Sequence, residues 1–159
     1  MQTIKPEALL SKEPTQEDLK MFEFYKKNPP LAAMDLLNQD LAPFQRIVLN
    51  GVMTHSYVIS VLARGSGKTR MMAMCAALLC MFNPKMRVGF LAPGFRQAKL
   101  SFSEFEAILN ESAHLDACVK RISKQTDQWS VEFHNGAFCF ALPLAADSAA
   151  SIRGVRLHA

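Results

Sequence analysis

The feature that most constrains the fold is a short apolar segment followed directly by a glycine-containing loop and a long apolar helix. Residues Tyr57–Leu62 read YVISVL, a run with several β-branched side chains that is typical of a strand buried on both faces. The loop follows at once, and the apolar run Arg70–Phe82 ends before Asn83-Pro84, as expected for a helix. This order of strand, loop and helix predicts an α/β fold.

The loop carries the residue types that bind phosphate groups. Leu62–Thr69 reads LARGSGKT, so the GKT end of the pattern GxxxxGK[ST] is intact and Leu62 replaces the leading glycine. Backbone N–H groups at a helix start attract negative charge, Lys68 should reach the β- and γ-phosphates, and Thr69 should bind Mg²⁺ through its hydroxyl. We therefore expect ATP and Mg²⁺ to bind a set of loop residues: Arg64, Gly65, Ser66, Gly67, Lys68 and Thr69.

Arg64, Phe44 and Gln45 can each be interpreted either as nucleotide-binding or as purely structural residues. Arg64 is expected to sense or act on the triphosphate, although a solvated loop cation is the alternative. Upstream, Phe44 and Gln45 enter a helix ahead of the predicted strand. The Phe44 ring would pack near adenine, and the Gln45 amide can satisfy both a donor and an acceptor of the base. Otherwise Phe44 is a core anchor and Gln45 is simply exposed.

The rest of the chain is predicted to alternate strands and helices. A helix capped by Thr15 should run to about Asn28, and Leu31–Asn38 and Pro43–Met53 should form two more. After the loop helix we expect the buried strand Val88–Ala92 and a helix from Phe95 to about Glu111. Asn135-Gly136 predicts a tight hairpin between Trp129–His134 and Ala137–Leu142. We expect a helical segment at 1–40 and a partial nucleotide-binding domain at 41–159.

Composition excludes several classes of protein. The formal charge of +4 is a modest excess that favours polyanions without defining a nucleic-acid tail. The four cysteines form no CxxC pair, so we expect no metal or disulfide framework and a reducing cytoplasm. The longest apolar stretch, Met71–Phe82, is shorter than the roughly 20 residues of a membrane span. The N-terminus does not read as a signal peptide.

From about Leu41 onward the chain resembles the large terminase subunit of tailed bacteriophages. The resemblance rests on FQR at Phe44–Arg46, ARGSGKT, LAPGFRQAK, the hairpin VEFHNGAFCFALP and SIRGVR near the end. It implies a P-loop NTPase of the ASCE type, with a parallel sheet flanked by helices, that hydrolyses ATP to package DNA into procapsids. It also implies double-stranded DNA, a small terminase subunit and a portal as partners. A homo-oligomeric ring in the bacterial cytoplasm, without a membrane, is implied as well.

The chain departs from the family pattern because no Walker B Asp-Glu pair follows SIRGVRLHA, and no nuclease cluster is seen. We therefore expect an incomplete ATPase domain that has no appreciable turnover alone. In some terminases an arginine ahead of the Walker B strand acts on the neighbouring subunit's nucleotide, and Arg153 is the matching position. Arg153 and Arg156 could equally be surface cations.

Two other functions are compatible with these residues. A superfamily-two helicase also joins an upstream Gln motif to a phosphate loop, but it usually keeps the leading glycine. A non-catalytic nucleotide-binding or assembly module would explain the missing acidic pair. Nucleotide binding measured beside turnover separates this last reading from a motor.

Overall fold

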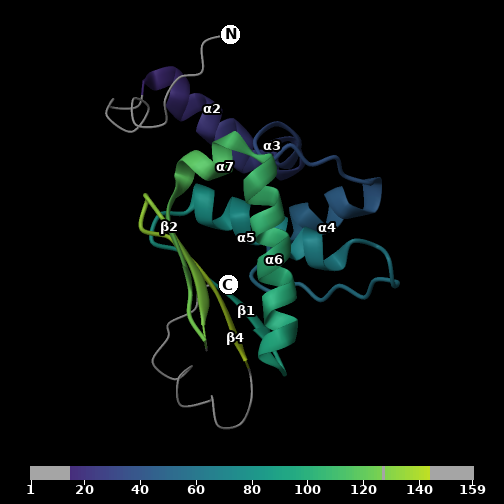
Figure 1. The fold of residues 1–159 in the computed structure, drawn as a ribbon. Coiled ribbons are helices and arrows are strands. Elements are labelled where there is room, and N and C mark those ends of the chain that lie inside the picture. Colours follow the sequence, from purple (N-terminus) through teal and green to yellow (C-terminus); the bar gives the residue numbers. More distant parts are fainter. Residues whose placement is uncertain (1–14, 127, 144–159) are drawn as a thin grey trace.

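The computed structural model describes residues 15–126 and 128–143 (Figure 1). Three helices come first: α2 (Gln16–Lys27), α3 (Pro29–Asp35) and α4 (Pro43–Thr54). Thr15 caps α2, because its hydroxyl accepts from the Asp18 N–H while the Asp18 carboxylate accepts from Thr15. The three predicted helices are confirmed. The largest difference is in α3, which begins at Pro29, because proline fits the first turn of a helix, and ends at Asp35 where Asn38 was predicted.

The remaining elements form a sheet with helices packed against it. They are α5 (Lys68–Phe82), β1 (Arg87–Ala92), α6 (Phe95–Glu111), α7 (Ala113–Cys118), β2 (Val119–Lys124), β3 (Trp129–Phe133) and β4 (Phe138–Pro143). The sequence had predicted all of these except α7 and β2. The β2 segment reads VKRISK and lacks the alternating apolar pattern from which a strand is predicted. Its charged side chains are typical of an exposed edge strand.

The sheet is mixed, with the strand order β1-β4-β3-β2. Only β1 and β4 are parallel, whereas β4–β3 and β3–β2 are antiparallel. The α/β class is therefore confirmed, but among the described strands the expected parallel sheet is limited to the β1–β4 pair, and the remaining pairs are antiparallel. The predicted hairpin is confirmed: Gly136 turns it with a φ of 80°, and Asn135 caps the turn through its side-chain oxygen. The amide of Asn135 also donates to the Cys80 carbonyl at the end of α5.

The core lies between the sheet and two helices. Helices α5 and α6 pack against each other, and both contact β1 and β4 (Figure 1). Phe102 and Phe105 of α6 are fully buried, and the Phe105 ring meets Phe133 of β3 edge-on with centroids 6.3 Å apart. Ala32 and Ala33 of α3 join the same buried cluster. This packing fixes the start of α5, where the candidate site lies.

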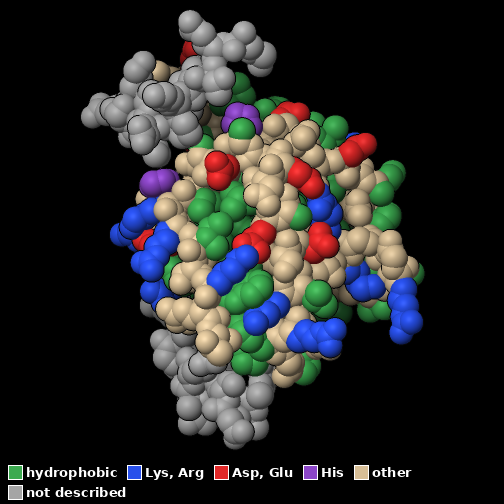
Figure 2. Space-filling model, viewed as in Figure 1, with side chains coloured by type: hydrophobic (Ala, Val, Ile, Leu, Met, Phe, Trp, Pro, Cys, Tyr) green, Lys and Arg blue, Asp and Glu red, His purple; other side chains and the backbone are tan. Residues whose placement is uncertain are grey.

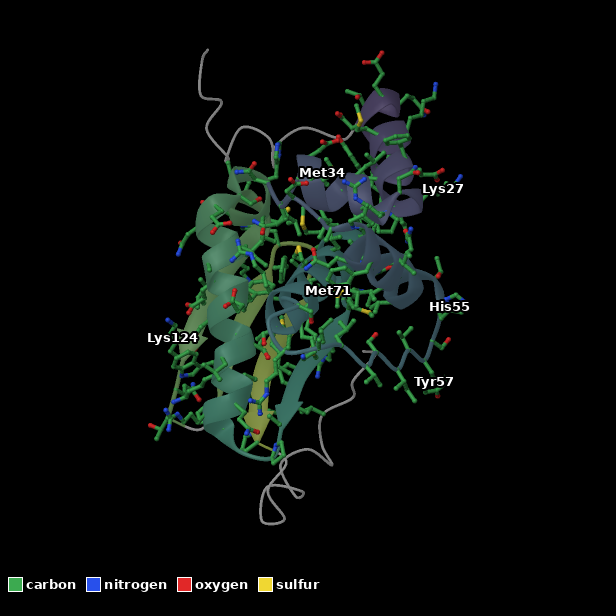
Figure 3. All side chains as sticks on the ribbon, turned by 90° about the vertical axis from the view of Figure 1, so that its right-hand side faces the viewer. Lys27, Met34, His55, Tyr57, Met71 and Lys124 are labelled. Atoms are coloured by element: carbon green, nitrogen blue, oxygen red, sulfur yellow. The ribbon has the colours of Figure 1, made fainter. Side chains whose placement is uncertain are left out.

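The predicted strand Tyr57–Leu62 is not a strand in the structure. No ladder joins it to the sheet, and the side chains of Tyr57, Ile59 and Val61 are 93–94% exposed. Figure 3 shows the labelled Tyr57 at the periphery of the molecule, whereas Met71 of α5 lies in the interior. The sequence pattern of 57–62 is that of a buried strand, but no described strand lies beside this segment to pair with it.

The surface carries mixed charge. Figure 2 shows Lys and Arg side chains interspersed with Asp and Glu on one face, with apolar side chains visible between them. Within the described ranges, no helix has both the length and the hydropathy to cross a lipid bilayer.

Candidate functional site

The candidate site is the loop that leads into α5. Gly65 and Gly67 both have positive φ, at 77° and 73°. At Gly67 the positive φ favours glycine, and a Cβ there would lie 3.0 Å from the Gln45 amide nitrogen, which would have to shift slightly. Gly67 is also the N-cap of α5, and no side chain caps this helix. The helix therefore presents its first N–H groups at the loop, which is a favourable place for an anion.

Lys68 lies at the first position of α5 and turns back onto the segment that precedes the loop. Its ammonium donates to the Leu62 carbonyl at 2.9 Å and to the Ala63 carbonyl at 2.7 Å. Ser66 closes the loop from the other side, because its hydroxyl donates to the same Ala63 carbonyl at 2.8 Å. An ammonium has three donors, so one N–H of Lys68 remains for a ligand.

Gln45 connects α4 to the loop across 21 residues of sequence. Its amide nitrogen donates to the Ser66 carbonyl at 3.1 Å, and its amide oxygen accepts from the Ala42 N–H at 3.0 Å. A primary amide has two donor hydrogens and two acceptor lone pairs, so one of each stays available. The Phe44 side chain beside it is 41% exposed.

The other predicted residues have simpler surroundings. Arg64 and Thr69 are exposed, and neither bonds to another side chain among the described residues. Arg153 lies outside the described residues. The structure therefore brings together Gln45, Ser66, Gly67 and Lys68 around one loop.

A polar network that the sequence did not reveal surrounds Arg70, the residue after Thr69. Its guanidinium donates to the Gln39 amide oxygen at 2.9 Å, to Glu104 at 3.4 Å and to Glu111 at 2.5 Å. Gln39 is buried and also donates to Glu111 at 2.8 Å. The Gln39 hydrogen bond and the Arg70 charge lower the pKa of Glu111. No local pattern signals this network, because it joins residues from distant parts of the chain.

Other titratable groups do not extend the site. In the described part of the chain, no three His, Cys, Asp or Glu side chains come together as a metal cluster. The cysteines Cys75, Cys80, Cys118 and Cys139 are free thiols, and burial raises the pKa of Cys75 to about 12. Such a thiol stays protonated and is a poor nucleophile.

The chain is similar to one class of known proteins. A solved structure described as the large terminase ATPase domain of Thermus phage P74-26 matches it with a TM-score of 0.59. That match has 17% sequence identity and covers 92% of this chain but 56% of the other. At this identity the match establishes the fold alone, a mixed α/β domain. The chain spans little more than half the length of that structure.

The family model described as terminase large subunit, T4likevirus-type, N-terminal, matches residues 59–159. This range is more than half of the chain and includes the loop. The chain therefore belongs to the family of large terminase subunits and corresponds to its N-terminal part. No curated protein matches it in sequence.

Proposed function

We propose that this chain is the ATP-binding part of a phage DNA-packaging motor. The observation that carries the proposal is the loop at the start of α5. Two glycines with positive φ, an uncapped helix N-terminus and Lys68 meet there in a chain of the terminase family. Together these supply backbone N–H groups and a cation for a triphosphate.

The residues of the loop fit a nucleotide with magnesium. Gly67 carries no Cβ and has a positive φ, so the backbone can approach a phosphate closely there. Lys68 would bind the β- and γ-phosphates, and the exposed Thr69 hydroxyl would hold Mg²⁺, which offsets phosphate charge when bound. Gly65 and Ser66 would contribute backbone N–H groups. Arg64, which has no side-chain partner among the described residues, would approach the triphosphate as a sensing or catalytic cation.

The base would lie against α4. The free N–H of the Gln45 amide would donate to N7 of adenine, and its free oxygen lone pair would accept from the N6 amino group. The second amide N–H and the second lone pair already bond to Ser66 and Ala42. The exposed Phe44 ring would cover the base. Gln45 would thus contact the base and the Ser66 carbonyl of the loop at the same time.

The complete motor would need more than these residues. Hydrolysis requires an acidic residue that orients water and holds the metal ion, and we assign none within 15–126 and 128–143. Arg153 would act across a homo-oligomeric ring on the neighbour's γ-phosphate. Double-stranded DNA, the small terminase subunit and the portal would be the partners, in the host cytoplasm. Residues 1–40 and 41–159 would be the helical entry and the partial ATPase domain.

ATP binding by the isolated chain tests the proposal. Calorimetry should detect Mg²⁺-dependent ATP binding that Lys68→Ala abolishes, because the variant loses the cation at the phosphates. Lys20→Ala is the matched control, since Lys20 is an exposed cation on α2. Equal ATP affinity for wild type and Lys68→Ala would overturn the proposal. We expect no steady turnover from either protein.

Arg153 needs a different test in a full-length protein. Arg153→Ala should lower turnover far more than nucleotide affinity, because a trans-acting arginine stabilises charge that develops during the reaction. Mixing Arg153→Ala with Lys68→Ala subunits should restore part of the activity. Absence of rescue at every mixing ratio would contradict action across subunits.

A further inference from the structure

The loop at the start of α5 is tied at both ends to the segment that leads into α4. On one side, the Gln45 amide donates to the Ser66 carbonyl at 3.1 Å. On the other side, Arg70 donates through Nε to the Gln39 amide oxygen at 2.9 Å. The two stretches of chain between these residues and the two hydrogen bonds therefore form a closed ring. This ring restrains movement of the loop relative to α4.

The end of α3 directs Gln39 into the protein interior. Asn38 has a φ of 55°, a left-handed conformation that asparagine adopts more readily than most residues. The Gln39 N–H donates to the Ala33 carbonyl at 2.9 Å, and the residue is only 6% exposed. Its side-chain amide donates to the Leu37 carbonyl at 3.0 Å and to Glu111 at 2.8 Å. A buried amide with both N–H groups and its oxygen bonded is held in one orientation.

The Arg70 side of the ring is anchored to α6. The guanidinium donates to Glu111 at 2.5 Å and to Glu104 at 3.4 Å. Hydrogen bonds between charged partners are stronger than neutral ones, so this side of the ring is firmer than the neutral bond from Gln45. Helices α5 and α6 lie side by side (Figure 1), so the ring is joined to the packed body of the domain.

The fold itself has little need of this network. The Arg70 side chain is 33% exposed, and those of Glu104 and Glu111 are 39% and 46% exposed. Ion pairs with this much solvent access add little to stability. Helices α5 and α6 are already held together by the buried cluster to which both contribute. The place of the network, one residue after Thr69, therefore points to a role at the loop.

The ring joins two groups that would contact opposite ends of a nucleotide. Gln45 would contact the base, whereas Lys68, which lies between Ser66 and Arg70 in the chain, would contact the triphosphate. A nucleotide reaches both groups without strain only if the distance between them matches its own length. The loop alone fixes this distance poorly, because the backbone of Gly67 has more conformational freedom than that of other residues.

We propose that Gln39 and Arg70 are positioning residues that fix the distance between Gln45 and Lys68. They thereby determine how strongly the site selects ATP over GTP. Neither residue contacts the nucleotide, and each acts through the ring. The inference rests on the proposed function, because it needs a triphosphate at the loop and a base at Gln45. Breaking the ring should weaken ligands that use both ends of the site and spare a ligand that contacts the loop alone.

Calorimetry with three ligands tests this positioning role. Wild type and Gln39→Met are titrated with MgATP, with MgGTP and with magnesium tripolyphosphate, which has no base. Gln39→Met removes the amide but keeps the ion pairs of Arg70, so the fold should be retained. The variant should weaken ATP binding by about 5- to 30-fold and reduce the preference for ATP over GTP. Its affinity for tripolyphosphate should change by less than about twofold.

Three further variants show whether the effect passes through the ring. Arg70→Lys keeps the charge but lacks the planar fork of donors, so it should also reduce the ATP preference. Gln45→Ala should reduce the preference as well, and Gln39→Met added to it should reduce the preference no further. Lys124→Met is the matched control, because it breaks a 2.8 Å ion pair with Glu106 of α6 outside the ring. It should leave all three affinities unchanged.

The outcomes distinguish this inference from the proposed function. If the wild type prefers ATP, an unaltered preference in Gln39→Met or Arg70→Lys would overturn the inference alone. Equal losses for ATP and tripolyphosphate, or a loss in Lys124→Met, would also overturn it by indicating a general effect on stability. Additive losses of preference in the variant that combines Gln39→Met with Gln45→Ala would do the same.

The behaviour of the wild type decides the rest. Equal affinity for ATP and GTP would overturn the inference together with the role of Gln45 at the base, but not phosphate binding by the loop. A wild type that binds neither ATP nor tripolyphosphate would overturn the proposed function, and this inference with it.

Discussion

The 57–62 segment and β4 are both short apolar runs, yet they lie in opposite environments. β4 is paired on both edges, between β1 and β3, and its residues Cys139–Leu142 are buried. The 57–62 segment has no backbone partner among the described residues, and alternate side chains are exposed. Burial of a strand therefore depends on its neighbours as much as on its own hydropathy, because a sheet must pair every backbone group it buries.

The largest difference between the two regions should appear in unfolding free energies. Phe133→Ala, next to β4 in the sheet, should destabilise the chain by about 3–5 kcal/mol, because it leaves a cavity beside Phe105. Tyr57→Ala should change stability by less than about 0.5 kcal/mol, since the ring is exposed. Urea denaturation monitored by circular dichroism measures both.

A chemically matched pair controls for the nature of the side chain. Val131 of β3 is fully buried, whereas Val61 is exposed. Val131→Ala should cost about 2 kcal/mol, from lost burial of two carbons and a small cavity, and Val61→Ala almost nothing. Similar losses for the two valines would show that 57–62 is packed in solution.

The glycines of the two regions should differ in what they control. Gly136→Ala in the hairpin should cost about 1–2 kcal/mol of stability because of its positive φ, without changing ATP affinity. Gly67→Ala should instead weaken ATP binding by about 5- to 30-fold, since the loop would relax away from the required conformation. The added Cβ would also press on Gln45.

Calorimetric ATP titrations beside thermal melts separate these two effects. A Gly67→Ala protein with normal ATP affinity would contradict the role proposed for the loop. Gly65→Ala is a useful intermediate, because its φ is positive but its Cβ would meet nothing within 4 Å. Its affinity loss should be no larger than that of Gly67→Ala.

The smallest expected effect concerns pH. The hydrogen bond from Gln39, with the charge and hydrogen bond of Arg70, holds the pKa of Glu111 below its ordinary value of 4.5. The resulting stabilisation is present above that value and is lost as the pH falls through the lowered pKa. Gln39→Met, similar in size, should therefore reduce the acid-induced loss of stability between about pH 6 and pH 3.

The sheet region offers a comparison for this pH effect. Lys120 lowers the pKa of the partly exposed Glu132 through a 2.7 Å hydrogen bond. Lys120→Ala should remove a similar acid-sensitive contribution from β2 and β3. Urea midpoints measured across the pH range test both variants. An unchanged acid response in Gln39→Met would show that Glu111 titrates normally in solution.

The amino-acid sequence by itself determined the local elements and the residue types of the candidate loop. The cap at Thr15, the start at Pro43, the end before Asn83-Pro84 and the turn at Asn135-Gly136 were all predictable, because neighbouring residues decide them. The family and the GKT loop were predictable for the same reason. Roles for Phe44, Gln45, Arg64, Lys68, Thr69 and Arg153 in nucleotide binding or turnover remain predictions.

Only the tertiary structure decided the pairing of strands and the contacts across the loop. The mixed sheet, the edge strand β2, the bond from Gln45 to Ser66 and the Arg70 network all join residues far apart in the chain. The exposure of alternate side chains in 57–62 is likewise decided by the tertiary structure. Hydropathy predicts which segments gain by being buried, but a strand is buried only where another segment supplies its hydrogen bonds.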